Sequence, residues 1–210
     1  MDAHITEILQ KPYDAWTETE RADIKEFCTP FREKPLSQMT VTERQTLLSM
    51  YLSFVWHYDA RRRAIAFAIL TEGFTASEIG AIQLKSKTMD GAIQIGESGI
   101  FMDDEIIRGC RRYMRGYAPN FTIEYPREHT ETRIFRDFVL PDYLWNARGF
   151  MPGPLFYMER KQGGVKNPIS VQAVQRVLRP ATAAFSLAGA GQIVQFCRIA
   201  DGLRWQFANA

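Results

Sequence analysis

The segment that most constrains the fold is a run of seven apolar residues, 64–70, which directly follows the three arginines at 61–63. A helix that is apolar on nearly every side has no face for water, so it belongs in the core of a globular domain. Gly73 comes soon after the run and predicts the end of this helix, because glycine is common just past helix C-termini. The run therefore predicts a central helix against which other elements pack.

Two capping boxes frame this helix in the sequence. Thr40 with Glu43 and Thr75 with Glu78 follow the pattern in which a threonine side chain caps a helix and a glutamate three residues later bonds back. The second box predicts a short helix through Ile82. The first box predicts a longer amphipathic helix, because apolar residues recur after it at Leu47, Leu48, Tyr51, Leu52 and Val55.

The rest of the chain predicts short strands and further helices. Residues 92–102 are typical of a β-hairpin, and residues 103–115 of a helix with acidic residues first and arginines last. Residues 118–152 predict a long irregular segment. A short strand at 155–157 and a helix over 170–178 follow. Together these elements predict an α+β fold that is mostly helical, with a small antiparallel β-hairpin or sheet.

Charge and proline content divide the chain into two parts. Residues 1–60 carry six Lys and Arg against ten Asp and Glu, whereas residues 61–210 carry twenty against fourteen. An acidic leader before a mildly basic body permits nucleic-acid binding without requiring it. We expect residues 1–37 to form a short helical N-terminal arm that ends in a linker at 30–37, and residues 38–210 to form the main domain.

Composition excludes several classes of protein. The chain has no run of about 20 uncharged apolar residues, which a membrane span needs, and its first residues lack the pattern of a signal peptide. The three cysteines lie far apart without a CxxC pair, and the histidines (His4, His57 and His129) follow no metal-ligand spacing. We therefore expect reduced thiols, structural or surface histidines, and a cytoplasmic protein with no metal, no cofactor and no small-molecule substrate.

Five segments occur in a characteristic order along the chain. They are the capped helix with the arginine-led apolar helix, residues 72–79 (EGFTASEI), the hairpin with the helix that ends at 111–113 (RRY), residues 153–178 with their Pro-Leu-Phe and Gly-Gly motifs, and residues 202–208 (GLRWQFA). In this order the chain resembles, over residues 39–210, the catalytic domain of tyrosine recombinases, the phage-integrase family. The resemblance implies a recombinase-like version of the α+β fold.

The resemblance also implies a chemistry, the cleavage and rejoining of DNA strands through a 3′-phosphotyrosine without a metal ion. Such a site gathers cationic side chains around one phosphate, because negative charge develops on its oxygens. At the matching positions only Arg204 is retained, whereas Thr75 replaces the other arginine and Asp201 replaces a histidine. The predicted hairpin carries no Lys or Arg, and the tyrosine nucleophile would follow Ala210. A salt bridge with Asp201, one helical turn away, is a second interpretation of Arg204.

DNA binding needs a basic surface and does not need the nucleophile, because such proteins hold DNA largely by its phosphate backbone. Residues 61–63 and 108–115 are arginine-rich candidates, although each is also typical of a solvated helix face. The favoured contacts surround the Gly-Gly turn and continue on the next helix, at Arg160, Lys161, Lys166, Gln172 and Arg176. The expected partner is double-stranded DNA, bound weakly, in the cytoplasm or on the nucleoid.

Three functions remain open from the sequence. The first is a catalytically inactive, recombinase-like DNA-binding protein of DNA recombination or integration, a pseudoenzyme left by a mobile element. The second is a regulatory or protein-interaction module that keeps only the fold, with an intact recombinase protomer as a partner that could lend its C-terminal segment. The third is a fragment of an active site-specific recombinase whose tyrosine is missing or supplied in trans.

Overall fold

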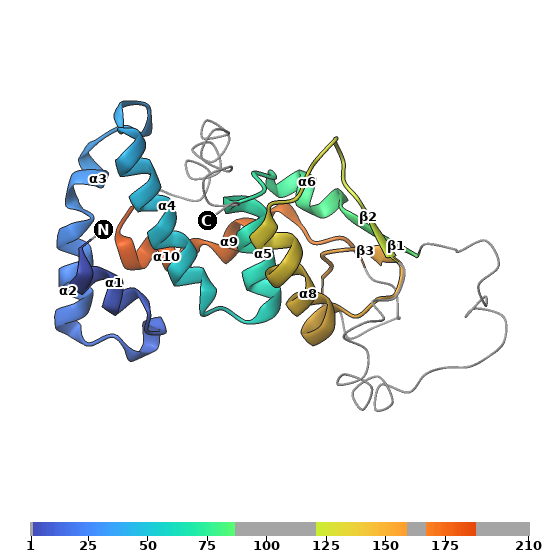
Figure 1. Cartoon of the computed structure of the whole chain (residues 1–210), viewed down its shortest axis with the longest axis horizontal. Coiled ribbons are helices and arrows are strands. Elements are labelled where there is room, and N and C mark those ends of the chain that lie inside the picture. The colour runs from blue at the N-terminus through green and yellow to red at the C-terminus, as the bar shows by residue number, and fades with distance from the viewer. Residues whose placement is uncertain (1, 87–120, 159–166, 188–210) are drawn as a thin grey trace.

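The structure is a computed structural model, and it describes residues 2–86, 121–158 and 167–187. Helices make up most of this part of the chain, and three short strands form an antiparallel sheet. The predicted α+β fold, mostly helical with a small antiparallel sheet, is confirmed at this level. The N-terminal helices lie at one end of the molecule, and the sheet lies toward the other (Figure 1).

Two consecutive helices, α4 (Val41–Trp56) and α5 (Ala60–Leu70), lead from the N-terminal end to the centre of the molecule. The predicted capping box begins α4, because Thr40 Oγ1 accepts from the Glu43 N–H at 3.2 Å and the Glu43 carboxylate accepts from the Thr40 N–H at 2.6 Å. Every residue from 64 to 70 is buried, which confirms the predicted core helix. Gly73 then takes a φ of 65°, a left-handed conformation that glycine adopts without strain.

Residues 3–38 fold into short helices, namely α1 (Ala3–Leu9), the 3₁₀ turn η1 (Tyr13–Ala15), α2 (Glu18–Phe27), α3 (Thr29–Glu33) and the 3₁₀ turn η2 (Leu36–Gln38). Of these, α1 packs on α4, and α2 packs on α1 and on α10 (Arg179–Phe185). Residues 30–37, where a linker was predicted, therefore hold most of α3 and the start of η2. Trp16 lies edge-on to Phe54 at 5.7 Å in the common core. Burial raises the pKa of Cys28 to about 12, so its free thiol stays protonated.

The sheet has the strand order β2-β1-β3. Strand β1 (Gln83–Ser86) pairs along its whole length with β2 (Phe121–Glu124), and its first two residues also pair with β3 (Gly153–Pro154). Helix α6 (Ala76–Ala81) precedes β1 and begins with the second predicted capping box. The sheet therefore joins segments that are far apart in the sequence.

The predictions for strands and helices around the sheet have mixed outcomes. The hairpin predicted at 92–102 and the helix predicted at 103–115 lie outside the described residues. The strand predicted at 155–157 is wrong, because the described strand is β3 and Tyr157 forms only a single bridge with Pro168. Leu155 and Phe156 have no exposed surface, so their apolar character reflects the core and not a strand.

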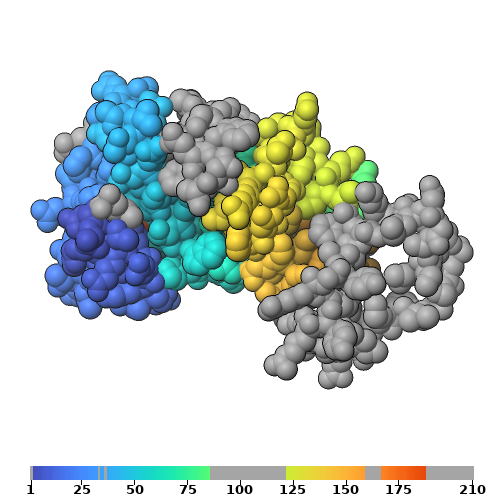
Figure 2. Space-filling model, in the orientation of Figure 1, coloured from blue at the N-terminus to red at the C-terminus, as the bar shows by residue number. Residues whose placement is uncertain are grey.

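The irregular segment predicted over 118–152 is wrong at 121–124 and 133–148, whereas residues 125–132 and 149–152 form no helix or strand. After β2 the chain forms one helical stretch, composed of the π-helix η4 (Phe135–Val139), α8 (Leu140–Tyr143) and the π-helix η5 (Leu144–Arg148). This stretch packs on α5 and covers part of the face shown in Figure 2. Wide π turns at both ends break the regular helical spacing, which explains why apolar periodicity did not reveal this stretch.

Helices α9 (Val171–Val177) and α10 (Arg179–Phe185) run along the opposite side of α5. Ser170 caps α9 by accepting from the Ala173 N–H at 3.3 Å, and the helix predicted over 170–178 is confirmed. Helix α9 packs on α6, while α10 packs on α4 and α2. Gly80 permits the contact near α9, because a Cβ at this position would lie only 3.0 Å from the Ile169 carbonyl oxygen.

Candidate functional site

Thr75, which stands at the first arginine position of the recombinase resemblance, is the N-cap of α6. Its hydroxyl donates to Glu78 Oε2 at 2.7 Å, and it also accepts from the Glu78 N–H at 3.3 Å. This side chain therefore serves the start of a helix and offers no positive charge to a phosphate. Arg204 and Asp201 lie outside the described residues, so the pocket expected to join them with Thr75 stays a prediction.

Arg127, in the bend after β2, lies beside the start of α6. Its Nε donates to Glu78 Oε1 at 3.2 Å, and its guanidinium carbon lies 4.8 Å from the centroid of the Phe74 ring. Its Nη2 lies 3.4 Å from the carbonyl oxygen of Glu72 and 3.5 Å from that of Gly73. Sequence reasoning missed this residue because Arg127 and Glu78 are 49 positions apart and share no motif.

Glu72, just after α5, is a fully buried carboxylate. The hydroxyls of Thr71 and Thr132 donate to it at 2.6 and 2.5 Å, the Thr132 N–H donates at 2.9 Å, and His129 Nε2 lies 2.9 Å away. Burial raises the pKa of Glu72, but the hydrogen bonds outweigh burial and hold that pKa below its ordinary value. The carboxylate therefore stays ionised in the core, and His129, with 3% of its side chain exposed, has a structural role.

The Glu72 network holds the bend that carries Arg127 in place. On one side of the bend Tyr125 stacks on Phe74, with 5.4 Å between ring centroids and 8° between ring planes. On the other side the His129 ring lies 4.5 Å from the same phenylalanine. Carboxylates surround this bend, because Glu72 follows α5, Glu78 lies on α6, and the Tyr125 hydroxyl donates to Glu131. This acidic surrounding favours a structural role for Arg127 over phosphate binding.

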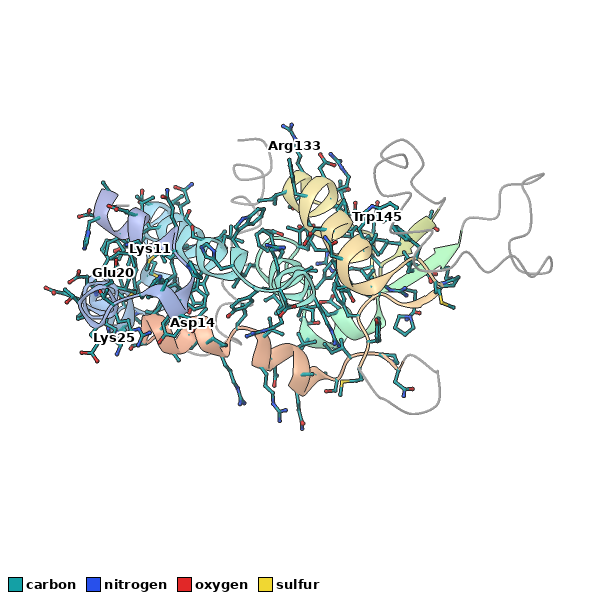
Figure 3. All side chains as sticks on the ribbon, turned by 90° about the horizontal axis from the view of Figure 1, so that it is seen from below. Lys11, Asp14, Glu20, Lys25, Arg133 and Trp145 are labelled. Carbon is teal, nitrogen blue, oxygen red and sulfur yellow. The ribbon has the colours of Figure 1, made fainter. Side chains whose placement is uncertain are left out.

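A different surface meets the needs of DNA binding better. Gln172 and Arg176, both predicted contacts, are exposed on α9, and Gln175 and Arg179 are exposed beside them. Residues 167–187 contain no Asp or Glu. Long side chains of α9 and α10 project outward at the lower edge of Figure 3, on the side opposite the labelled Arg133. We call the four exposed side chains of α9 and α10 the α9–α10 surface.

The other predicted DNA contacts, Arg160, Lys161 and Lys166, lie outside the described residues. They come just before α9 in the sequence, and their place relative to the α9–α10 surface stays a prediction. Within the described chain, no ion pair links Arg176 or Arg179 to a carboxylate. The charge of these two guanidinium groups is therefore available to a partner.

A hollow of about 280 Å³ lies between β2 and the helical stretch 135–148. This volume is just below the range of pockets that bury drug-sized ligands, about 300–1,000 Å³. The walls of this hollow are mostly apolar, with Glu131 and Arg136 among Ile123, Leu140, Leu144, Trp145 and Phe150.

Within the described ranges no group of three or more His, Cys, Asp or Glu residues could hold a metal ion.

No family model, no curated protein and no solved structure matches this chain. Among the described helices, none is long and apolar enough to cross a membrane.

Proposed function

We propose that this chain is a tyrosine recombinase-like DNA-binding protein of DNA recombination or integration, with a degenerate recombinase fold and no catalytic activity of its own. The observation that carries the DNA-binding part is the α9–α10 surface. It presents two guanidinium groups and two amide side chains, and residues 167–187 add no negative charge. Such a protein would act on the nucleoid, in the cytoplasm.

The chemistry of the α9–α10 surface suits duplex DNA. Arginine forks bind phosphate oxygens through two parallel N–H donors, and arginine and glutamine side chains also match base edges in the major groove. Two arginines make few phosphate contacts, so the expected affinity is modest and falls steeply as salt rises. Arg160, Lys161 and Lys166 would add charge at the start of the same helix.

The chemistry and bonding of Thr75 support the proposed lack of catalytic activity. Family chemistry needs a fixed cation at this position, and threonine supplies none. The hydroxyl and N–H of Thr75 are both engaged with Glu78. A covalent adduct between this chain and a suicide duplex substrate would contradict the absence of catalysis and favour a fragment of an active recombinase.

The first prediction concerns Arg176 on the α9–α10 surface. Arg176→Gln is expected to weaken binding of a duplex oligonucleotide roughly tenfold at low salt and to make the slope of log K against log salt shallower by about one. Fluorescence anisotropy titrations at several salt concentrations measure both quantities. Arg133→Gln is the matched control, because Arg133 is 65% exposed and lies on the opposite side of the molecule (Figure 3).

The titration tests both the DNA-binding function and the place of the binding surface. The control is expected to bind DNA like the unmodified protein. Equal losses in both variants would indicate a general effect of charge and contradict a defined surface. Absence of binding by the unmodified protein, even at low salt, would overturn the DNA-binding function.

A protein-interaction module that keeps only the fold is the second candidate function. Two large apolar side chains favour it, because Phe138 on η4 and Met151 just after η5 are 59% and 70% exposed. Exposed apolar side chains mark contact sites where they form one continuous patch, so this candidate requires that a partner covers both. This candidate gains support if the unmodified protein fails to bind duplex DNA.

A further inference from the structure

The three arginines that open α5 have different surroundings. Arg61 donates to the Tyr157 carbonyl oxygen, which ties α5 to the segment after β3. Arg63 donates to the Trp56 carbonyl oxygen at 2.6 Å and to Asp142 at 2.7 Å, which ties α5 to α8. Arg62 is exposed, and its guanidinium carbon lies 4.4 Å from the centroid of the Tyr58 ring. Two arginines of the triplet therefore serve the fold, and the middle one faces solvent.

Tyr58 is a fixed platform for Arg62. Its ring meets Phe54 edge-on, with 5.9 Å between centroids and 84° between ring planes. Burial raises the pKa of Tyr58 to about 12, and the Arg62 charge and the Ala181 backbone reduce this effect. The phenol is therefore neutral near pH 7, and its contact with the Arg62 guanidinium is through the ring face. Phe54 also meets Phe185 of α10 at 5.3 Å, so the ring that holds Arg62 belongs to the aromatic cluster beside that helix.

We infer, building on the proposed function, that Arg62 extends the α9–α10 surface onto α5 and contacts a DNA backbone phosphate there. A guanidinium that rests with its face on an aromatic ring keeps its edge N–H groups directed outward, in the geometry that matches two phosphate oxygens. Tyr58 is the positioning residue, because it orients Arg62 without touching DNA. Asp59 is the nearest carboxylate in the sequence, and it already caps α5 by accepting from the Arg62 backbone N–H at 2.9 Å.

The test compares salt-dependent duplex binding of Arg62 variants with that of Arg176→Gln and the Arg133→Gln control. Arg62→Gln is expected to weaken binding severalfold and to make the slope of log K against log salt shallower by about one. The double variant with Arg176→Gln is expected to lose about two units of slope. Arg62→Lys is expected to keep the slope but bind less tightly, because an ammonium lacks the planar fork.

Tyr58 variants give a readout that a purely electrostatic effect would not produce. Tyr58→Phe keeps the ring face and is expected to bind like the unmodified protein, whereas Tyr58→Leu removes the platform and is expected to weaken binding toward the level of Arg62→Gln. Thermal unfolding identifies any variant that fails to fold. If Tyr58→Leu fails to fold, Tyr58→Phe and the variants at the exposed Arg62 still test the inference.

The outcomes separate this inference from the function on which it rests. An unchanged slope in Arg62→Gln, with a shallower slope in Arg176→Gln, would overturn the role of Arg62 and leave DNA binding intact. Equal losses in Arg62→Gln and Arg133→Gln would also overturn it, since any surface charge would then have the same effect. No binding by the unmodified protein would overturn both.

Discussion

At the scale of single residues, Glu72 shows how this core tolerates a charge. A carboxylate without water is costly unless hydrogen bonds replace its hydration. Here two threonine hydroxyls, one backbone N–H and one histidine nitrogen supply those bonds. Because two of the four come from Thr132 and one from His129, the charge also fastens the segment after β2 to the end of α5.

Glu72→Gln is expected to lower the free energy of unfolding by about 2–4 kcal/mol at pH 7, because an amide nitrogen cannot accept the hydrogen bonds of the carboxylate. The folded-state pKa of Glu72 lies below the ordinary value of 4.5. The ionised carboxylate therefore stabilises the fold fully above about pH 4.5 and progressively less as the pH falls through the folded-state pKa. Urea unfolding at pH 7 and at lower pH values measures both effects.

The control for this prediction is Glu128→Gln. Glu128 is exposed on the same segment, so its loss is expected to change the free energy of unfolding by less than about 0.5 kcal/mol. The variants should also differ in pH dependence, with a weaker decline below about pH 4.5 for Glu72→Gln. An identical decline in the two variants would contradict the role given to the Glu72 charge.

At the scale of elements, the threonine–glutamate capping box begins three of the described helices. Two boxes were predicted, at Thr40 and Thr75. The third begins α2, where Thr17 Oγ1 accepts from the Glu20 N–H at 3.2 Å. Its Thr-x-x-Glu pattern is visible in the sequence, where residues 1–37 predict a short helical arm without the bounds of its helices. The same local signal therefore also marks a helix in the acidic part of the chain.

Thr40→Ala is expected to lower the free energy of unfolding by about 1 kcal/mol, because the Glu43 N–H loses its acceptor at the start of α4. Thr42→Ala is the matched control, since Thr42 is exposed in the same turn. It is expected to have an effect below about 0.5 kcal/mol. Urea unfolding of both variants measures the difference, and equal effects would show that the cap is not the source of stability.

At the scale of the whole molecule, the N-terminal helices and the main body share one core. Tyr13, Trp16 and Phe54 form an aromatic cluster, and Phe54 also meets Phe185 of α10 at 5.3 Å. Trp16 is 4% exposed, and its indole N–H donates to the Lys11 carbonyl oxygen at 3.1 Å. The N-terminal helices and α10 thus meet around α4, and α10 also packs directly on α2.

Trp16→Ala is expected to lower the free energy of unfolding by about 3–5 kcal/mol, the usual cost of removing a buried aromatic side chain. Because the core is shared, the whole protein should still unfold in one transition, observed alike by circular dichroism and by fluorescence. Trp56→Ala is the control and should cost less, because Trp56 is 43% exposed. A separate early transition in Trp16→Ala would instead indicate an independent N-terminal arm.

Some of the candidate site could be predicted from the sequence, and some could not. Gln172 and Arg176 were proposed as contacts, and the structure places both on the exposed side of α9. Arg148 gave no such signal. It is 3% exposed, and its guanidinium donates to the carbonyl oxygens of Gly149 and Pro154 at 3.0 and 2.9 Å. A buried arginine that bonds backbone carbonyls has no sequence pattern, because its partners are defined only by the folded turn.

The sequence by itself determined the features that depend on neighbours a few residues apart. The capped starts of α4, α6 and α9, the buried helix at 64–70 and the helix end near Gly73 all follow from local hydrogen bonds and apolar spacing. These interactions form within one or two helical turns, so they can be recognised without knowledge of the fold.

Only the tertiary structure decided which distant segments meet. It paired β1 with β2, placed Arg127 on Glu78, and separated Arg62 from its two neighbours in the triplet. The strand pairing and the Arg127–Glu78 contact join residues whose spacing in the chain carries no periodic signal. They form because packing around α5 brings the segments together, and burial then decides which charges are paired inside and which remain open to a partner.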